Sequence, residues 1–330
     1  MKLNNPKKIL IIRFSSLGDV LLTTPLLRIL KNKYPKTEID YLVKTSFSDA
    51  VKLNPNIKNV VSWQTEEEFH LAIIKLKNAK YDYVIDLQNN FRSKKIVSKL
   101  GKNSFCFKKP NIKKFLLVNF KLNLLKNEKS IPQRYVEVIP ELKIDEKGLE
   151  LFLPEENKTQ IFEDKPIIGL APGAFHFTKR WPIDFYAEVG NKLTNEGFKI
   201  VILGGKSDRE ICNLLSIKID RSIDLSNDNK LFETASNMKK CKLVICNDSG
   251  LMHTATAVGT PVIAIFGSTV KEFGFVPFGV KNLIIENNNL SCRPCSHIGK
   301  STCKKKHFNC MNQIFPNLVY KKTIQLLSSL

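Results

Sequence analysis

Short apolar runs alternate along the chain with longer segments in which apolar positions recur every three or four residues. The short runs are typical of strands buried on both faces of a parallel sheet, and the longer spacing is typical of amphipathic helices. In the first half we predict strands at 8–14, 39–43, 60–61 and 83–87, and helices at 20–34, 45–53 and 66–80. This alternation predicts a parallel sheet covered by helices on both faces.

The second half repeats the pattern after a polar, acidic segment at 141–165, within which we place a linker at about 150–163. We predict strands at 166–171, 197–203, 223–225, 242–246 and 262–266, the last completing the sheet, and helices at 183–195, 208–215, 231–240, 251–258 and 316–330.

The pattern therefore predicts an α/β protein with two Rossmann-like domains and a cleft between them. We expect an N-terminal domain at 1–155, a C-terminal domain at 160–315, and a closing helix at 316–330 that is free to pack back on the N-terminal domain. In such folds ligands bind beyond the carboxyl ends of the strands, so the loops at those ends are the candidate sites.

The composition, 43% hydrophobic and 25% charged, is that of a soluble globular protein. The sequence has no apolar run long enough to span a membrane. The apolar run at 9–12 is followed by Arg13 and Asp19 and by no small-residue cleavage site, which argues against a signal peptide. Four of the eight cysteines fall in one late cluster, a distribution that suits reduced thiols better than a disulfide framework. We expect a cytoplasmic protein.

The net charge of +21 predicts a polyanionic partner: nucleic acid, an acidic membrane surface or an acidic glycolipid. Between Arg92 and Lys129 twelve basic residues stand against one acid, Glu128. A general preference for lysine in the organism is the alternative interpretation, and it explains the concentration in one stretch less well.

Three loops in the second half suit a nucleotide. The turn 247–250 joins a predicted strand to a helix, where backbone N–H groups and the helix dipole stabilise a diphosphate. The turn 171–174 has Lys179 and Arg180 nearby, and the loop 204–210 offers acids for ribose hydroxyls. Each could equally be an ordinary surface turn.

In the first half, Asp19 follows the first predicted strand. A carboxylate there is either a helix cap, which position alone favours, or a general base facing the cleft.

Other motifs narrow the chemistry. The chain lacks GxGxxG and a P-loop, which argues against a dinucleotide dehydrogenase and an NTPase, and no DxD follows a strand. A late cluster of cysteines could bind zinc, but its spacings are not those of a standard finger, and we favour a reduced cluster without metal; its members are Cys292, Cys295, Cys303 and Cys310.

Taken together, these loops resemble the ADP-heptose–lipopolysaccharide heptosyltransferases of glycosyltransferase family 9, from about residue 8 to residue 315. The matching segments are 11–20 with Thr24-Pro25, 86–88, Pro172-Gly173 with 179–182, Gly204-Gly205 with 208–210, and 247–253; Cys292 to Cys295 and His307 to Cys310 look like the tail of the type II enzymes.

The resemblance implies a GT-B architecture and an inverting sugar transfer that needs no metal or other cofactor. The donor would be an ADP-sugar and the acceptor the Kdo-containing lipid A–core of a Gram-negative bacterium. The enzyme would then work in the cytoplasm, with a peripheral position on the anionic inner face of the inner membrane left open.

The resemblance also assigns roles. Asp19 becomes the base, which reverses the preference for a cap, and Lys179 neutralises the leaving diphosphate. The nucleotide-sugar site would comprise Gly173, Ala174, Asp208, Asp248, Ser249, Gly250, Leu251 and His253, with Asp208 weakly assigned because Ser207 stands where some members carry a ribose-binding glutamate. The acceptor site would comprise Ser16, Gly18, Arg92 and Lys94.

Two alternatives stay open. A family member with another nucleotide sugar, or a nucleotide-sugar epimerase of GT-B type, would keep the fold and change the reaction. A basic nucleic-acid-binding protein is disfavoured, because no platform of interleaved aromatic and basic residues is present.

Overall fold

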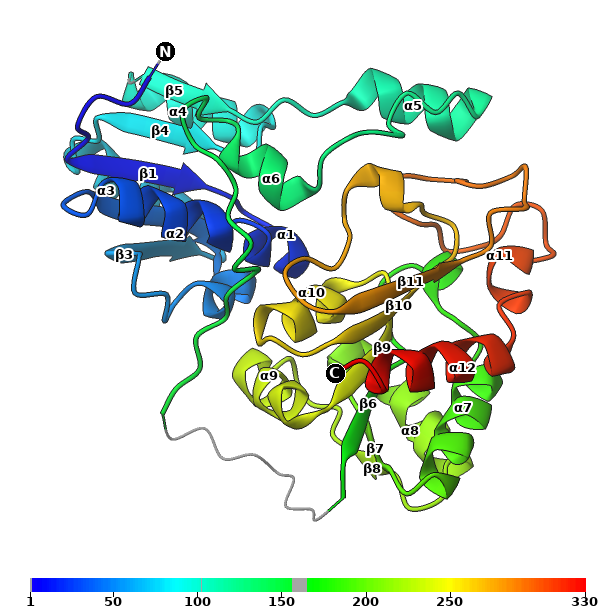
Figure 1. Ribbon diagram of the computed structural model, residues 1–330. Coiled ribbons are helices and arrows are strands. Elements are labelled where there is room, and N and C mark those ends of the chain that lie inside the picture. The colour runs from blue at the N-terminus through cyan, green and yellow to red at the C-terminus, as the bar shows by residue number, and fades with distance from the viewer. Residues whose placement is uncertain (1, 102, 156–164) are drawn as a thin grey trace. The chain divides into compact units, whose positions relative to one another are not determined.

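The structure is a computed structural model that describes residues 2–101, 103–155 and 165–330 (Figure 1). Its contacts divide the chain into two compact units. Unit 1 comprises residues 1–110 and 129–152, and unit 2 comprises residues 111–128 and 153–330. Most of the predicted linker, 156–163, lies outside the described residues.

Unit 1 contains a parallel sheet in the order β3-β2-β1-β4-β5 (Figure 1). The strands are β1 (Lys8–Ile12), β2 (Glu38–Lys44), β3 (Asn59–Trp63), β4 (Tyr83–Asp86) and β5 (Asn103–Cys106). Residues 9–12 of the central strand β1 are completely buried, which explains their continuous apolar pattern. Four strands were predicted, whereas β5 was not. Its sequence contains one large apolar residue, Phe105, and resembles a loop.

The helices of unit 1 are α1 (Leu17–Leu21), α2 (Thr24–Lys33), α3 (Glu66–Asn78), α4 (Phe91–Leu100) and α6 (Ile131–Val136). The single helix predicted at 20–34 is wrong. Pro25 lies in the first turn of α2, and the hydroxyl groups of Thr23 and Thr24 donate to the carbonyls of Val20 and Leu21, so a new helix begins there. The helix predicted at 45–53 is a shorter 3₁₀ helix, Thr45–Ala50.

Unit 2 contains a second parallel sheet, in the order β11-β10-β9-β6-β7-β8. The strands are β6 (Ile167–Ala171), β7 (Lys199–Ile202), β8 (Ile223–Asp224), β9 (Leu243–Asn247), β10 (Val262–Phe266) and β11 (Asn282–Glu286). This is the doubly wound order of nucleotide-binding folds. The expectation that 262–266 completes the sheet is wrong, because β11 adds a further edge strand along β10.

The helices of unit 2 are α5 (Asn111–Phe120), α7 (Ile183–Asn195), α8 (Arg209–Lys218), α9 (Leu231–Lys240), α10 (Gly250–Ala257), α11 (Asn309–Asn312) and α12 (Pro316–Leu327). Helix α12 packs on α7: Val319 and Leu326 enter the core of unit 2, and the Tyr320 hydroxyl donates to Glu196 Oε1 at 2.8 Å. The C-terminal helix is therefore part of unit 2, whereas the sequence left open that it packs on the N-terminal domain.

The basic stretch 92–129 divides between the two units. Helix α4 and strand β5 lie in unit 1, whereas residues 111–128 belong to unit 2, where Leu117 and Leu125 pack against Val270 and Phe273. This interleaving was not predicted, because the sequence analysis placed one boundary near residue 155.

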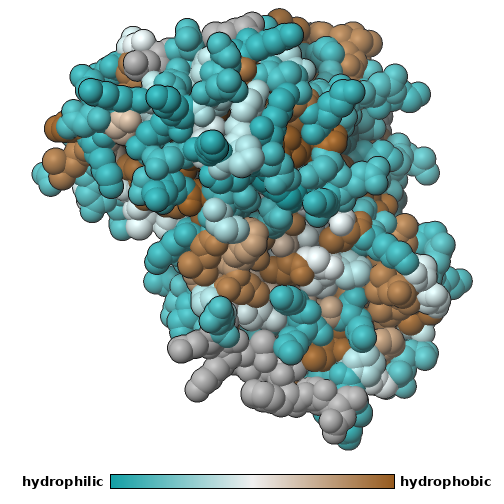
Figure 2. Space-filling view, turned by 60° about the vertical axis from the view of Figure 1, so that its left-hand side comes forward, coloured by the Kyte–Doolittle hydropathy of each residue, from teal (hydrophilic) through white to brown (hydrophobic). Residues whose placement is uncertain are grey.

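Hydrophilic side chains predominate on the face of the molecule shown in Figure 2, and apolar ones gather there in separate patches. No helix among the described residues combines the length and apolar character needed to cross a bilayer.

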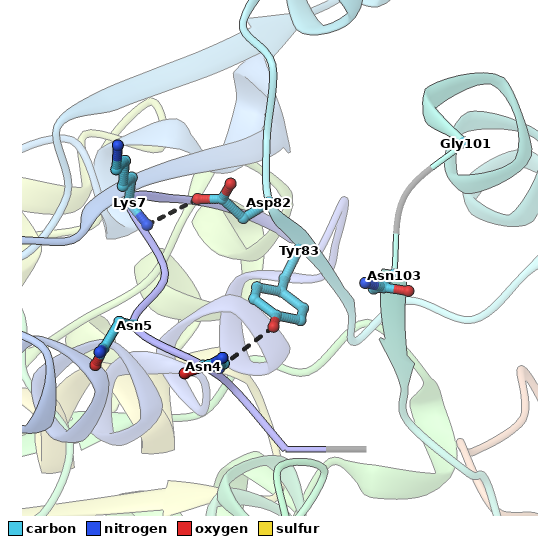
Figure 3. A pocket seen from close by; sticks show the side chains of 7 residues that line it. All are labelled: Asn4, Asn5, Lys7, Asp82, Tyr83, Gly101 and Asn103. Carbon is cyan, nitrogen blue, oxygen red and sulfur yellow. Dashed lines mark hydrogen bonds between the residues drawn. The ribbon is translucent and has the colours of Figure 1, made fainter.

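A polar hollow lies at the amino ends of β1, β4 and β5 (Figure 3). The backbone N–H of Lys7 donates to Asp82 Oδ2 at 2.7 Å, and that of Asn4 donates to the Tyr83 hydroxyl at 3.3 Å. The hollow is at the edge of the sheet opposite the carboxyl ends, so it is not the site that the fold predicts.

Two leucines on α3 provide a test of the core of unit 1. Leu76 is 1% exposed and Leu71 is 66% exposed. We expect Leu76→Ala to lower the free energy of unfolding by about 3 kcal/mol, because it leaves a cavity. The matched control, Leu71→Ala, should change it by less than about 0.5 kcal/mol. Urea denaturation measures both, and equal effects would contradict the packing described.

Candidate active site

The carboxyl ends of β1 and β4 lie side by side in unit 1, and a buried arginine joins the loops that follow them. Arg13 is 7% exposed. Its guanidinium donates to the carbonyl of Leu87, after β4, at 2.8 Å and lies 2.5 Å from Asp19 Oδ1. A single side chain thus positions the predicted base relative to the β4 loop. The sequence analysis quoted Arg13 in a motif but gave it no role.

Asp19 is the third residue of α1, and it caps that helix. Its Oδ2 accepts from the backbone N–H of Ser16 at 3.2 Å and from the Ser16 hydroxyl at 2.9 Å. The helix cap that position alone favoured is therefore present in the structure. The side chain of Asp19 is still 17% exposed, so the carboxylate also reaches solvent. Gly18 is buried within α1.

The loop after β4 is ordered by Asp86, which is completely buried. Its carboxylate accepts from the Ser93 hydroxyl at 2.7 Å and from the backbone N–H groups of Gln88 and Asn89. The ammonium group of Lys109 donates to the carbonyl of Asn89 at 3.2 Å.

Lys109 is a basic residue of this edge that the sequence analysis counted but did not single out. Burial and the positive charge of Arg13 lower its pKa, and Asp86 and Asp19 act in the opposite direction. It follows β5, the strand that the sequence did not reveal, and so its position at the carboxyl edge of the sheet could not be predicted.

The predicted acceptor residues Arg92 and Lys94 are placed differently. Arg92 forms an ion pair with Glu66 of α3 at 2.6 Å and lies over the Phe69 ring at 5.1 Å, so it joins α4 to α3. Lys94 is exposed on the same helix, and its charge acts on Lys109.

In unit 2 the corresponding position is the adjacent carboxyl ends of β6 and β9. Asn247, at the end of β9, is completely buried. Its side-chain amide donates to the carbonyl of Pro172 at 2.7 Å, and its oxygen accepts from the backbone N–H of Trp181 at 3.0 Å. Asn247 therefore fixes the glycine turn and the start of α7 against the β9 loop.

Lys179 and Asp248, which the sequence placed in two separate loops, form an ion pair at 2.8 Å. Asp248 Oδ2 also accepts from the Thr269 hydroxyl at 2.6 Å. The side chain of Asp248 is 8% exposed and that of Lys179 is 16% exposed, so the pair is largely buried. Thr269, after β10, was not predicted as a site residue.

Helix α10 starts beside this pair. Ser249 is its N-cap in an extended conformation, and its buried hydroxyl oxygen has no hydrogen-bond partner within the described part of the chain. Gly250 and Leu251 begin the first turn, whose amides have no intrahelical partner, and His253 is buried one turn further on. The arrangement offers amide donors, one hydroxyl and a cation to an anion.

The glycine turn after β6 lies directly against Asp208. A Cβ atom on Gly173 would overlap the carboxyl group of Asp208, whose Oδ2 accepts from the backbone N–H of Gly205 at 3.1 Å. Ala174 is buried, and its carbonyl accepts from Arg180 Nε at 2.7 Å. Asp208 thus caps its own loop, and its carboxyl group packs directly against Gly173.

The cluster Cys292, Cys295, Cys303 and Cys310 lies in a C-terminal segment that the side chain of Arg293 fixes by hydrogen bonds. Arg293 is buried and donates to the carboxylate of Glu286 at 2.8 Å and to the carbonyl of Thr269 at 2.7 Å. None of the cysteines is in a disulfide, and burial raises the pKa of the Cys310 thiol to about 12. The sulfur of Cys292 lies 3.9 Å from His307 Nε2, yet no group of three or more potential ligands among the described residues is arranged to hold a metal ion.

Comparison with protein-family models matches residues 71–306 to glycosyltransferase family 9 (heptosyltransferase). The chain belongs to glycosyltransferase family 9. The matched residues include the loops that contain Gly173, Lys179, Asp208 and Asp248, but not Asp19, His307 or Cys310.

Individual relatives extend the likeness to nearly the whole chain. It is 27% identical over 321 residues to lipooligosaccharide heptosyltransferase 2 of Campylobacter jejuni, covering 95% of this chain and 96% of the relative. It is 25% identical over 302 residues to lipopolysaccharide heptosyltransferase 2 of Salmonella typhimurium, covering 81% and 84%.

The structure of E. coli ADP-heptose LPS heptosyltransferase II superposes with a TM-score of 0.75 at 23% identity, covering 98% of this chain and 99% of that one. At this identity the likeness concerns the fold, and it confirms the predicted GT-B architecture.

The close approach of Gly173 to Asp208 yields a prediction about this site. Gly173→Ala should lower the free energy of unfolding by about 1–3 kcal/mol, because the added methyl group displaces the Asp208 carboxylate. In an Asp208→Ala background the same substitution should cost clearly less. Denaturant unfolding of the four chains measures the coupling, and strict additivity would show that the contact is absent.

Proposed function

We propose that this family 9 glycosyltransferase transfers heptose from ADP-heptose to the inner core of lipopolysaccharide, with inversion at the anomeric carbon. The observation that carries the proposal is the Lys179–Asp248 pair beside the first turn of α10, within the family's matched residues. The names of the relatives and of the similar structure support heptose and ADP as the sugar and nucleotide.

Unit 2 would bind the donor. The amides of Gly250 and Leu251 and the hydroxyl of Ser249 would donate to the diphosphate, which favours the positive end of the helix dipole. Lys179, held by Asp248, would stabilise the charge that develops on the diphosphate as the glycosidic bond breaks. Asp208 would accept from a ribose hydroxyl on its remaining oxygen. The mechanism requires no metal.

Unit 1 would bind the acceptor. Asp19 would accept the proton of the attacking hydroxyl, while Arg13 and the Ser16 cap hold the carboxylate in one orientation. The acceptor is acidic, and Lys109 and Lys94 provide positive charge at this edge, with Lys109 replacing Arg92 in our assignment because Arg92 is paired with Glu66.

The base assignment predicts a specific loss. Asp19→Asn keeps a side-chain oxygen that can accept from Ser16 but removes the proton acceptor. We expect the transfer rate to fall by about 10²–10⁴-fold while the affinity for ADP stays within about twofold. Turnover with purified acceptor and calorimetry with ADP measure the two quantities. Because the variant also removes the charge that pairs with Arg13, its melting temperature should fall, and turnover is compared at a temperature where both chains are folded. A retained rate would remove Asp19 from the mechanism.

The donor assignment predicts selective stabilisation by nucleotides. ADP should raise the melting temperature more than UDP or GDP at equal concentration, because binding to the folded state stabilises it. Lys179→Ala should reduce both this shift and the transfer rate, since it removes the cation. Lys192→Ala, which removes a partly exposed lysine of α7 that pairs with Glu188 and donates to Asn317, is the matched control and should change neither. Stabilisation by UDP alone would contradict the ADP-heptose assignment and favour another nucleotide sugar or an epimerase.

A further inference from the structure

Residues 111–128, here called the α5 segment, contain helix α5 and the chain that returns from it. One face of the segment is anchored in unit 2. Leu117 and Leu125 are 5% and 1% exposed and pack against Val270 and Phe273. The ammonium group of Lys121 donates to the carbonyl of Pro294 at 2.8 Å.

The opposite face of the α5 segment presents large apolar side chains to solvent. Ile112 is 77% exposed, Phe115 58% and Phe120 68%, and the spacing of three and eight residues from Ile112 places all three along one side of the helix. Leu122 and Leu124, 51% and 48% exposed, extend the apolar surface beyond the helix. Five such side chains within 13 positions mark an interaction surface, since isolated exposed apolar residues are the norm.

The charge of the same segment indicates what covers this surface. It contains four lysines, Lys113, Lys114, Lys121 and Lys126, against one acid, Glu128. Lys113 pairs with Glu128 at 2.6 Å, Lys114 lies over the rings of Phe273 and Phe275, and Lys126 is exposed. A segment that combines an exposed apolar face with an excess of positive charge favours a partner that is apolar inside and anionic at its surface.

We propose that the α5 segment is the membrane-docking surface of this protein, and that it binds the interface of a bilayer containing anionic lipids. The apolar side chains enter the boundary between head groups and acyl chains, and the exposed Lys126 contacts lipid phosphates. The helix has ten residues and is about 15 Å long, half of what would cross the hydrocarbon core, so it lies in the interface.

A second copy of the chain is the competing occupant, and charge argues against it. In a two-fold symmetric contact the lysines of one copy would face the same lysines of the other. The inference deepens the proposed function, because a lipid-linked acceptor is reached at such a surface.

The fluorescence of one added tryptophan can report directly whether the α5 segment enters a membrane. The two native tryptophans, Trp63 and Trp181, are buried, so one placed at the tip of the segment by Phe120→Trp gives a distinct signal. Its emission should shift to the blue when vesicles of phosphatidylethanolamine and phosphatidylglycerol are added, and the shift should weaken at high salt. Ile217→Trp, on the exposed face of α8, is the matched control and should not shift.

Affinity measurements complete the test. In flotation with the same vesicles, the triple variant Ile112→Ser, Phe115→Ser, Phe120→Ser should bind at least about tenfold more weakly. Lys126→Gln should bind about threefold to fivefold more weakly. The double variant Leu214→Ser, Ile217→Ser, which changes exposed apolar residues of α8, should bind within about twofold of the unmodified chain.

Several outcomes would overturn the proposal. These are unchanged binding of the triple variant, equal binding to neutral phosphatidylcholine, or a dimer of the unmodified chain in light scattering that the triple variant dissociates without any vesicle binding. The vesicles contain no sugar acceptor, so the result is independent of the proposed transfer reaction. The triple variant should also keep its rate on a delipidated, water-soluble acceptor; if the unmodified chain transfers no heptose to that acceptor, the proposed function fails and the docking result stands.

Discussion

The parallel pairing of strands that are distant in the chain is the constraint on which the candidate site residues of each unit depend. Strand β1 pairs with β4, and β6 pairs with β9, so that in each unit the two central strands end side by side. At these positions the direction of winding reverses, and the following loops separate to leave room for a ligand. Arg13 in unit 1 and Asn247 in unit 2 then join the paired loops by hydrogen bonds from a buried side chain.

Arg13 and Asn247 hold their loops for the same physical reason. A buried amide or guanidinium is costly unless its hydrogen-bonding groups find partners, so loops that supply those partners are held in one arrangement. Asn247 uses both ends of its amide, and Arg13 uses a carbonyl and a carboxylate. The cap bonds of Asp19 are therefore compatible with the proposed role of this carboxylate as a base. The cap bonds restrict the orientation of the carboxylate, and a restricted carboxylate is what proton transfer to a fixed base requires.

The central strands and the loops after them could be predicted from the sequence, because burial on both faces leaves a continuous apolar run. Among the edge strands, β3 and β8 were predicted, whereas β5 and β11 were not. Residues 103–106 form β5 with one large apolar residue, and β11 was missed beyond the apolar run of β10, so both required tertiary pairing to be recognised. Because β5 was not predicted, Lys109, which follows it, was not recognised as a candidate site residue. The direction of a long basic side chain could not be predicted either: Arg92 was expected to contact the acceptor, but the structure shows that it turns toward Glu66.

The ion pair between Lys179 and Asp248 determines which groups could balance the negative charge of a diphosphate at each stage of the proposed reaction. Because Lys179 is paired with Asp248, the two side chains together carry no net charge when no ligand is bound. A diphosphate that enters must then be held mainly by the amides at the start of α10, which are neutral donors with a fixed direction. In the proposed reaction the lysine would contribute most where negative charge increases, that is, as the sugar leaves and the terminal phosphate gains a charge. Asp248, anchored by Thr269, would thereby weaken ground-state binding relative to transition-state binding, which is the difference that accelerates a reaction.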